Sequence, residues 1–89
     1  MIRRELTITN RLGLHARATA KLVQLLSSFR CQATLEARGR EVNAKSIMGV
    51  MLLAAGPGSE VVLCVDGEDQ QAAADAVTAL FERRFDEDS

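Results

Sequence analysis

The chain of 89 residues is long enough for one domain, residues 1–89, with a single modest core. Its formal net charge is -1 and its only aromatic residues are three phenylalanines. It therefore lacks the clustered positive charge and the stacking surfaces of a nucleic-acid-binding protein. No stretch approaches the ~18 apolar residues that cross a bilayer, and no apolar signal core follows the N-terminus. We expect a cytoplasmic protein that does not contact the membrane.

The first predicted elements are a strand and a helix. Over residues 2–9 the apolar side chains Ile2, Leu6 and Ile8 alternate with polar ones, which is typical of a half-buried strand. From Ala16 to about Ser28 the period becomes helical. The polar stripe of this amphipathic helix consists of Arg17, Lys21, Gln24 and Ser28.

The middle of the chain predicts a hairpin and a short helix. Alternation over residues 31–37 is followed by a tight turn at Arg38-Gly39 and a short strand from Arg40 to Asn43. Ser46 then precedes an apolar segment that ends at Ala55, before Gly56, as expected for a short helix with a serine N-cap. The side chains expected to face the core are Val50, Leu52 and Leu53.

The last part predicts an interior strand from Glu60 to Asp66, apolar on both faces, and a helix from about Asp69 to Arg83. The tail from Asp86 to Ser89 is expected to be frayed. The order β-α-β-β-α-β-α favours an α+β fold in which one four-stranded antiparallel sheet is covered on one face by three helices.

The two cysteines predict no metal or redox site. Cys31 and Cys64 fit neither a metal-ligand spacing nor a CxxC pattern, and each lies in an apolar, strand-like run. We expect free, packed thiols. A disulfide and a reactive thiol are the alternatives.

The single histidine, His15, lies where an extended segment gives way to the first helix. A helix N-terminus presents unpaired N–H groups and a partial positive charge, which disfavour imidazolium and hold anions. We expect the backbone of Ala16 and Arg17, with the Arg17 guanidinium, to bind phosphate beside a nucleophilic His15. Gly13 permits an unusual backbone ahead of the helix. A lone histidine can instead be a simple surface or packing residue.

Two separated motifs resemble those of the HPr family, the histidine-containing phosphocarriers of the bacterial phosphotransferase system. They are Asn10-Arg-Leu-Gly-Leu-His-Ala-Arg17 and Ala44-Lys-Ser-Ile-Met-Gly-Val-Met-Leu-Leu53, and the resemblance extends over nearly the whole chain. It implies an open-faced β-sandwich in which His15 accepts phosphate at Nδ1 from phospho-enzyme I and passes it to a histidine of an enzyme IIA component, with Arg17 accompanying the phosphohistidine. Phosphoenolpyruvate is the ultimate donor, and no cofactor or metal is implied.

The chain departs from the family pattern at one position, and its sequence does not decide between the nitrogen-related and the sugar-transport branch of the family. Ala18 stands where most relatives carry proline in the first helical turn; alanine adopts that conformation too, so we expect unchanged chemistry. The ending from Leu80 to Asp88 looks more like the nitrogen-related NPr branch than the sugar-transport proteins. A monomer is expected.

Ser46 and its neighbours have a structural and a regulatory interpretation. Ser46 is expected to cap the short helix. By resemblance it is also a regulatory phosphosite for HPr kinase/phosphorylase, where phosphate would add negative charge to a docking surface. That surface is expected to comprise Ala20, Lys21, Ile47, Met48 and Met51, because methionine adapts to several partners. Core packing is the alternative for the apolar members.

Two other functional classes compete with a phosphocarrier, which would not be an enzyme on its own. One is a regulatory binding module that uses the same surface under control of Ser46; the presence of His15 favours the carrier. The other is a small α/β nucleic-acid binder, which the charge and the lack of aromatic residues disfavour.

Overall fold

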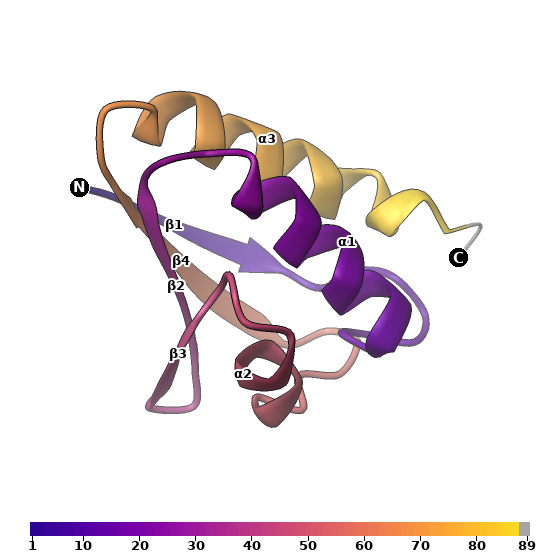
Figure 1. Cartoon of the computed structure of the whole chain (residues 1–89). Helices are drawn as coiled ribbons and strands as arrows, with labels where there is room; N and C mark the ends of the chain where they lie inside the picture. The colour runs from indigo at the N-terminus through magenta and orange to yellow at the C-terminus, as the bar shows by residue number, and fades with distance from the viewer. Residues whose placement is uncertain (88–89) are drawn as a thin grey trace.

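A four-stranded antiparallel sheet with three helices forms the fold in this computed structural model, which describes residues 1–87 (Figure 1). The strands are β1 (Ile2–Thr7), β2 (Gln32–Ala37), β3 (Arg40–Asn43) and β4 (Glu60–Asp66). Their order across the sheet is β1-β4-β2-β3, and each neighbouring pair is antiparallel. The predicted fold class and element order are confirmed.

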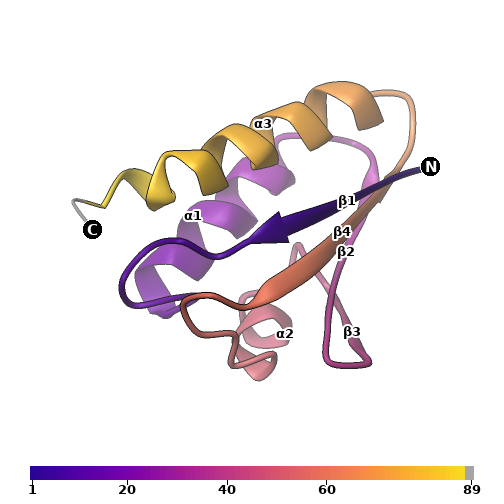
Figure 2. The same ribbon diagram turned by 180° about the vertical axis from the view of Figure 1, so that it is seen from behind.

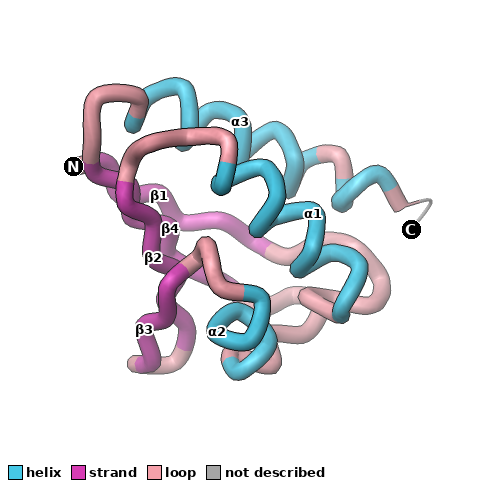
Figure 3. The backbone as a smooth tube through the Cα atoms, in the orientation of Figure 1, coloured by secondary structure: helices cyan, strands magenta, loops and turns pink. Residues whose placement is uncertain are grey.

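The helices are α1 (Ala16–Ser27), α2 (Ile47–Leu52) and α3 (Gln70–Glu82), followed by a short turn, η1 (Arg84–Asp86). Both ribbon views show α1 and α3 side by side on the same side of the sheet (Figures 1 and 2). The smaller α2 lies against α1 and β3, at the lower end of the sheet (Figure 3). None of the helices in the described part of the chain is long and apolar enough to cross a membrane.

The strand alternation builds the core. In β2 the buried side chains are Ala33, Leu35 and Ala37, and Leu35 lies opposite the equally buried Leu63 of β4. The prediction that β4 is an interior strand is confirmed, because it pairs with β1 on one side and β2 on the other. Its other face, with Val62 and Cys64, is half-buried on the side of the sheet away from the core.

The turn between β2 and β3 occurs where predicted. Arg38 and Gly39 both have positive φ, 54° and 80°, and connect the directly paired Ala37 and Arg40. Two central residues with positive φ are the type I′ arrangement, whose twist matches that of a β-hairpin.

The prediction for α2 was wrong at its C-terminal end. The helix stops at Leu52 rather than Ala55, and Ala54 has a φ of 50°, outside the helical region. Val50 and Leu53 are buried as expected, but Leu52 is 60% exposed. Leu52 is four residues after Met48, so both side chains lie on the outward face of this short helix.

The two cysteines are free thiols. Cys31 is buried in the core, and this burial raises the pKa of its thiol, with a further contribution from Asp69. The Asp69 carboxylate accepts hydrogen bonds from the backbone N–H groups of Arg30 and Cys31, which ties the start of β2 to the start of α3.

Candidate functional site

His15 is the N-cap of α1. Its backbone is extended (φ -75°, ψ -179°), and its Nδ1 accepts a hydrogen bond of 3.3 Å from the backbone N–H of Arg17. The loop ahead of it depends on Gly13, whose φ is +67° and which packs against the backbone of Ala55 and Gly56. Leu14 N–H donates to the Ala55 carbonyl at 3.0 Å, so the loop is anchored to the segment after α2.

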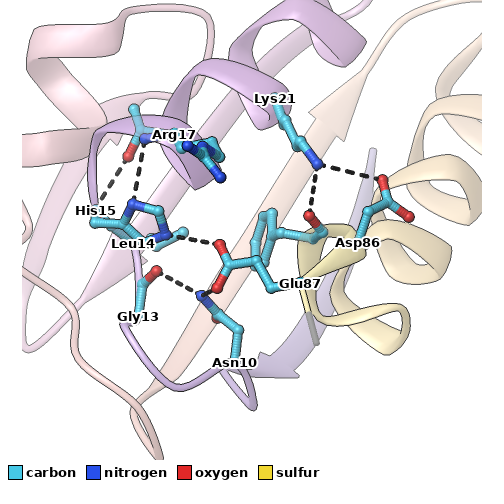
Figure 4. Close-up of polar contacts among 10 residues, drawn as sticks. Asn10, Gly13, Leu14, His15, Arg17, Lys21, Asp86 and Glu87 are labelled. Carbon is cyan, nitrogen blue, oxygen red and sulfur yellow. Dashed lines mark hydrogen bonds and ion pairs between the residues drawn. The ribbon is translucent and has the colours of Figure 1, made fainter. Parts of the chain in front are cut away.

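The other ring nitrogen of His15 has a carboxylate partner. Nε2 lies 2.6 Å from Oε2 of Glu87, and the His15 side chain keeps 27% of its surface exposed (Figure 4). A carboxylate only accepts hydrogen bonds, so Nε2 carries a proton. Nδ1 accepts from Arg17 N–H and therefore carries the lone pair of the neutral ring. Both nitrogens have partners, but the ring remains partly accessible.

Asn10 holds the same carboxylate from the opposite side. It is fully buried, and its Nδ2 donates to the Gly13 carbonyl at 2.8 Å and to Glu87 Oε1 at 3.1 Å. Because both partners are acceptors, they set the orientation of the amide. The carboxylate of Glu87 thus bridges Asn10 and His15 (Figure 4).

Glu87 stays ionised in this setting. Partial burial raises the pKa of its carboxyl, but the hydrogen bonds from His15 and Asn10, the charge that the His15 ring carries when protonated and the nearby charge of Lys21 outweigh that effect, and the pKa is lowered overall. An ionised Glu87 places a permanent negative charge next to the imidazole.

The C-terminal segment reaches the site through a left-handed turn. Arg84, Phe85 and Asp86 have φ values of 55°, 56° and 62°, which non-glycine residues rarely adopt. Phe85 is fully buried and packs against Phe81, with 4.8 Å between ring centroids. Lys21 Nζ donates to the Phe85 carbonyl at 2.8 Å and lies 3.6 Å from Asp86 Oδ2. The expected fraying is therefore wrong for Asp86 and Glu87, and the rest of the tail lies outside the described residues.

The surface around His15 forms an open cavity of about 710 Å³. Three cations, Arg11, Arg17 and Lys21, line it together with His15, and Asp86 and Glu87 lie on the acidic side. The sequence placed both Arg17 and Lys21 on the polar stripe of α1, and predicted phosphate binding for Arg17 and partner docking for Lys21. Ala16, at the first helical position, is exposed and also lines the cavity. The arrangement can accept an anion at the helix N-terminus, next to a nucleophilic nitrogen.

Sequence reasoning missed three members of this site. Arg11 and Asn10 lie within the motif that carries His15, but no periodicity indicates their roles. Glu87 lies 72 positions from His15, in an acidic tail whose composition is typical of a solvated terminus. The only available signal was the acidic tail itself, which could pair with a cation.

Ser46 caps α2 as predicted, since its Oγ accepts from Gly49 N–H at 3.0 Å. The apolar side chains around it are exposed rather than packed: Ile47 by 47%, Met48 by 75% and Met51 by 44%. Because α1 and α2 are in contact, this surface adjoins the helix that carries His15. Ala20 and Lys21, on α1, are half-buried.

Three comparisons relate the chain to known proteins. Residues 2–83 match the family described as the PTS HPr component phosphorylation site. Phosphocarrier protein HPr of Xylella fastidiosa is 61% identical over 89 residues, the whole of both chains. Phosphocarrier protein NPr of Shewanella violacea is 41% identical over 88 residues, 99% of this chain and 97% of its own.

The solved structures agree with these relatives. The crystal structure of HPr-C-His from Thermoanaerobacter tengcongensis matches with a TM-score of 0.97 and 40% identity over the whole of both chains. A second structure from that organism, described as an HPr dimer, has a TM-score of 0.79 and 41% identity, covering 98% of this chain and all of its own.

Proposed function

This chain belongs to the HPr family of the phosphotransferase system, and we propose that His15 is its phosphoryl acceptor, charged by phospho-enzyme I and discharged to a histidine of an enzyme IIA component. The observation that carries this proposal is the geometry of the ring: a lone pair on Nδ1, directed at the N-terminus of α1, within a cavity lined by three cations. The protein acts as a carrier and not as a stand-alone enzyme.

The chain itself contributes a nucleophile and positive charge. As Nδ1 attacks phosphorus, its long hydrogen bond to Arg17 N–H opens, and that N–H becomes available to a phosphoryl oxygen. Transfer passes through a loose transition state with negative charge on three oxygens. Arg11, Arg17 and Lys21 offset this charge. Because the cavity is open to water, the stabilisation stays moderate, as a reversible carrier requires.

A labelling experiment tests this function. Incubation with phosphoenolpyruvate and enzyme I is expected to place one phosphoryl group on the protein, stable to hydroxide and labile to acid. Adding an enzyme IIA component should then discharge it. Omission of enzyme I is the control. An acid-stable label would contradict a phosphohistidine, and failure to discharge to any enzyme IIA would contradict the carrier role.

We also assign partner docking to the surface formed by Ala20, Lys21, Ile47, Met48 and Met51. Met48→Asp places a charge on this surface and is expected to weaken enzyme I binding by at least about tenfold, since a charge without a partner is costly to bury. Folding should be preserved because Met48 is 75% exposed. Isothermal titration measures the affinity.

Thr7→Asp is the matched control for the docking prediction, because it adds the same charge at an exposed position of β1. Equal affinity for Met48→Asp and the parent protein would remove this surface from the interface. Equal weakening by both variants would indicate an effect of net charge alone.

Regulation at Ser46 is the second candidate function, favoured by its position beside the docking surface. Ser46→Asp is expected to slow phosphorylation of His15, because the added charge lies among the docking side chains. Aspartate is also a good N-cap, so α2 is retained. Quenched-flow kinetics with enzyme I measures the rate.

Ser46→Ala separates charge from capping. It removes the cap, at about 1 kcal/mol of folding stability, but adds no charge, and the rate should stay near that of the parent. Equal slowing by alanine and aspartate would show that capping, and not charge, is responsible. HPr kinase/phosphorylase is the partner that this regulation requires.

The monomeric state remains a prediction, and so does the branch of the family, sugar-transport or nitrogen-related, to which the chain belongs. We expect a monomer, although several structural relatives are described as dimers. The relative named NPr is less similar than the HPr from Xylella fastidiosa, at 41% against 61% identity. The choice between sugar uptake and nitrogen-related regulation depends on which enzyme IIA discharges the protein.

A further inference from the structure

The contact between His15 and Glu87 joins the site to a part of the chain beyond the family match. That match ends at residue 83, whereas Glu87 Oε2 lies 2.6 Å from His15 Nε2. The contact is also built into the structure. Asn10 holds the second carboxylate oxygen, and the left-handed turn at Arg84–Asp86 is secured by the buried Phe85 and by Lys21.

We propose that Glu87 is a positioning residue for His15: its carboxylate keeps the proton on Nε2, and so keeps the lone pair on Nδ1, the nitrogen that receives the phosphoryl group. This inference rests on the proposed function. The imidazole has two tautomers, and only the one with a bare Nδ1 can attack from the side of the helix N-terminus. In the alternative tautomer the proton is on Nδ1 and Nε2 is bare. The Nδ1–H group would then face the Arg17 N–H, which places two donors face to face, and Nε2 could no longer donate to Glu87.

The transfer step shows a second contribution of Glu87. The Nδ1 lone pair forms the new bond to phosphorus, while the bond between phosphorus and the donor breaks and its electron pair leaves with the donor atom. The proton on Nε2 remains in place, so the ring gains one positive charge. The Glu87 carboxylate, already ionised and hydrogen-bonded to Nε2, opposes that charge without reorganisation.

The negative charge of Glu87 also repels the incoming phosphoryl group. The ring lies between the two, because Nδ1 and Nε2 point in different directions, and the cations Arg11, Arg17 and Lys21 line the cavity that would receive the phosphoryl group. The contact of 2.6 Å with the proton-bearing nitrogen is short, as expected of a charge-assisted hydrogen bond. We therefore expect the stabilisation of the ring to exceed the repulsion.

Two variants separate the tautomer from the charge. Glu87→Gln keeps a carbonyl acceptor but removes the charge, whereas Glu87→Ala removes both. Glu68→Gln is the matched control: it removes one exposed carboxylate in the loop between β4 and α3, ahead of the N-terminal end of α3 and remote from the C-terminal turn that carries Glu87. The whole chain is used, and the melting temperature of each variant verifies the fold.

The first measurement is the ¹⁵N NMR spectrum of the His15 ring at a pH where it is neutral. The parent protein, Glu68→Gln and Glu87→Gln are expected to show a protonated Nε2 and a bare Nδ1. In Glu87→Ala the two nitrogen signals should move toward each other, as the second tautomer becomes populated. Parent-like signals in Glu87→Ala would overturn the assignment of the tautomer to Glu87.

The second measurement is the rate of phosphoryl acceptance from phospho-enzyme I. Glu87→Ala is expected to be about tenfold slower, and Glu87→Gln to show a smaller loss, since a hydrogen bond to a charged group contributes more than a neutral one. An unchanged or faster rate in Glu87→Ala would overturn the proposal, and a faster one would make the tail inhibitory. If the parent accepts no phosphoryl group, the proposed function fails, while the NMR measurement still decides the role of Glu87.

Discussion

Replacing His15 by asparagine is expected to abolish phosphorylation by phosphoenolpyruvate and enzyme I. His15 is the only histidine in the chain, and an amide has no lone pair that can form a stable bond to phosphorus. Asparagine is among the best N-cap residues, so it can replace the hydrogen bond from Arg17 N–H to the ring and keep the start of α1. Phosphoryl incorporation, followed by mass spectrometry, measures the loss.

His15→Ala provides the matched comparison. It should also take no phosphate, but it removes the cap and is expected to lower the free energy of unfolding by about 1 kcal/mol relative to the asparagine variant. Docking on enzyme I should survive in both variants, because the exposed apolar side chains lie on α2. Retention of an acid-labile label in either variant would place the acceptor elsewhere and end the assignment.

Replacing Gly13 by alanine is expected to destabilise the fold by about 3 kcal/mol or more. The position has a φ of +67°, which costs an L-residue roughly 1–2 kcal/mol. A Cβ there would also lie 2.7 Å from the Ala55 carbonyl oxygen and 2.8 Å from the Gly56 Cα. Both neighbours are backbone atoms and cannot rotate away, so the loop before His15 must shift. Urea unfolding measures the change.

Gly58→Ala is the control for this prediction. Its φ is +84°, but a Cβ would meet nothing within 4 Å. Gly58→Ala should therefore lower the free energy of unfolding by about 1 kcal/mol, which is the cost of a positive φ at alanine without any close contact. The difference between the two variants isolates the close approach of the loop to residues 55 and 56. An equal loss of stability in both variants would mean that the loop before His15 can move away from residues 55 and 56 at no cost, and that their close packing does not hold His15 in place.

Two strands were predicted to the residue, whereas β1 was predicted over residues 2–9 and ends at Thr7, and the predicted bounds of β2, α1 and α3 differ by one residue. The bounds of β3 and β4 agree with the sequence prediction, as does the turn at Arg38-Gly39. In each case the period of the side chains and the conformational freedom of glycine act within a few residues. His15 at the start of α1 was predictable for the same reason, since the change of period identifies where the helix begins.

The errors in the prediction concern ends and surfaces. The sequence indicated a longer α2 and a buried Leu52, because an apolar run does not reveal which face of a short helix meets the core. The frayed tail was the larger error. Acidic termini are usually solvated, and here the outcome depends on Lys21 and Phe85, which hold Asp86 and Glu87 in place.

The amino-acid order alone was enough to predict the strands, the helices and a nucleophilic ring at a helix start, because these follow from neighbours in the chain. The partners of that ring were decided only when the chain folded. Glu87 meets His15 through a contact between distant segments, since 72 positions separate the two residues, and the Glu87 carboxylate also accepts a hydrogen bond from Asn10. Periodicity carries no information about such contacts, whereas packing of α1 against the C-terminal turn creates them.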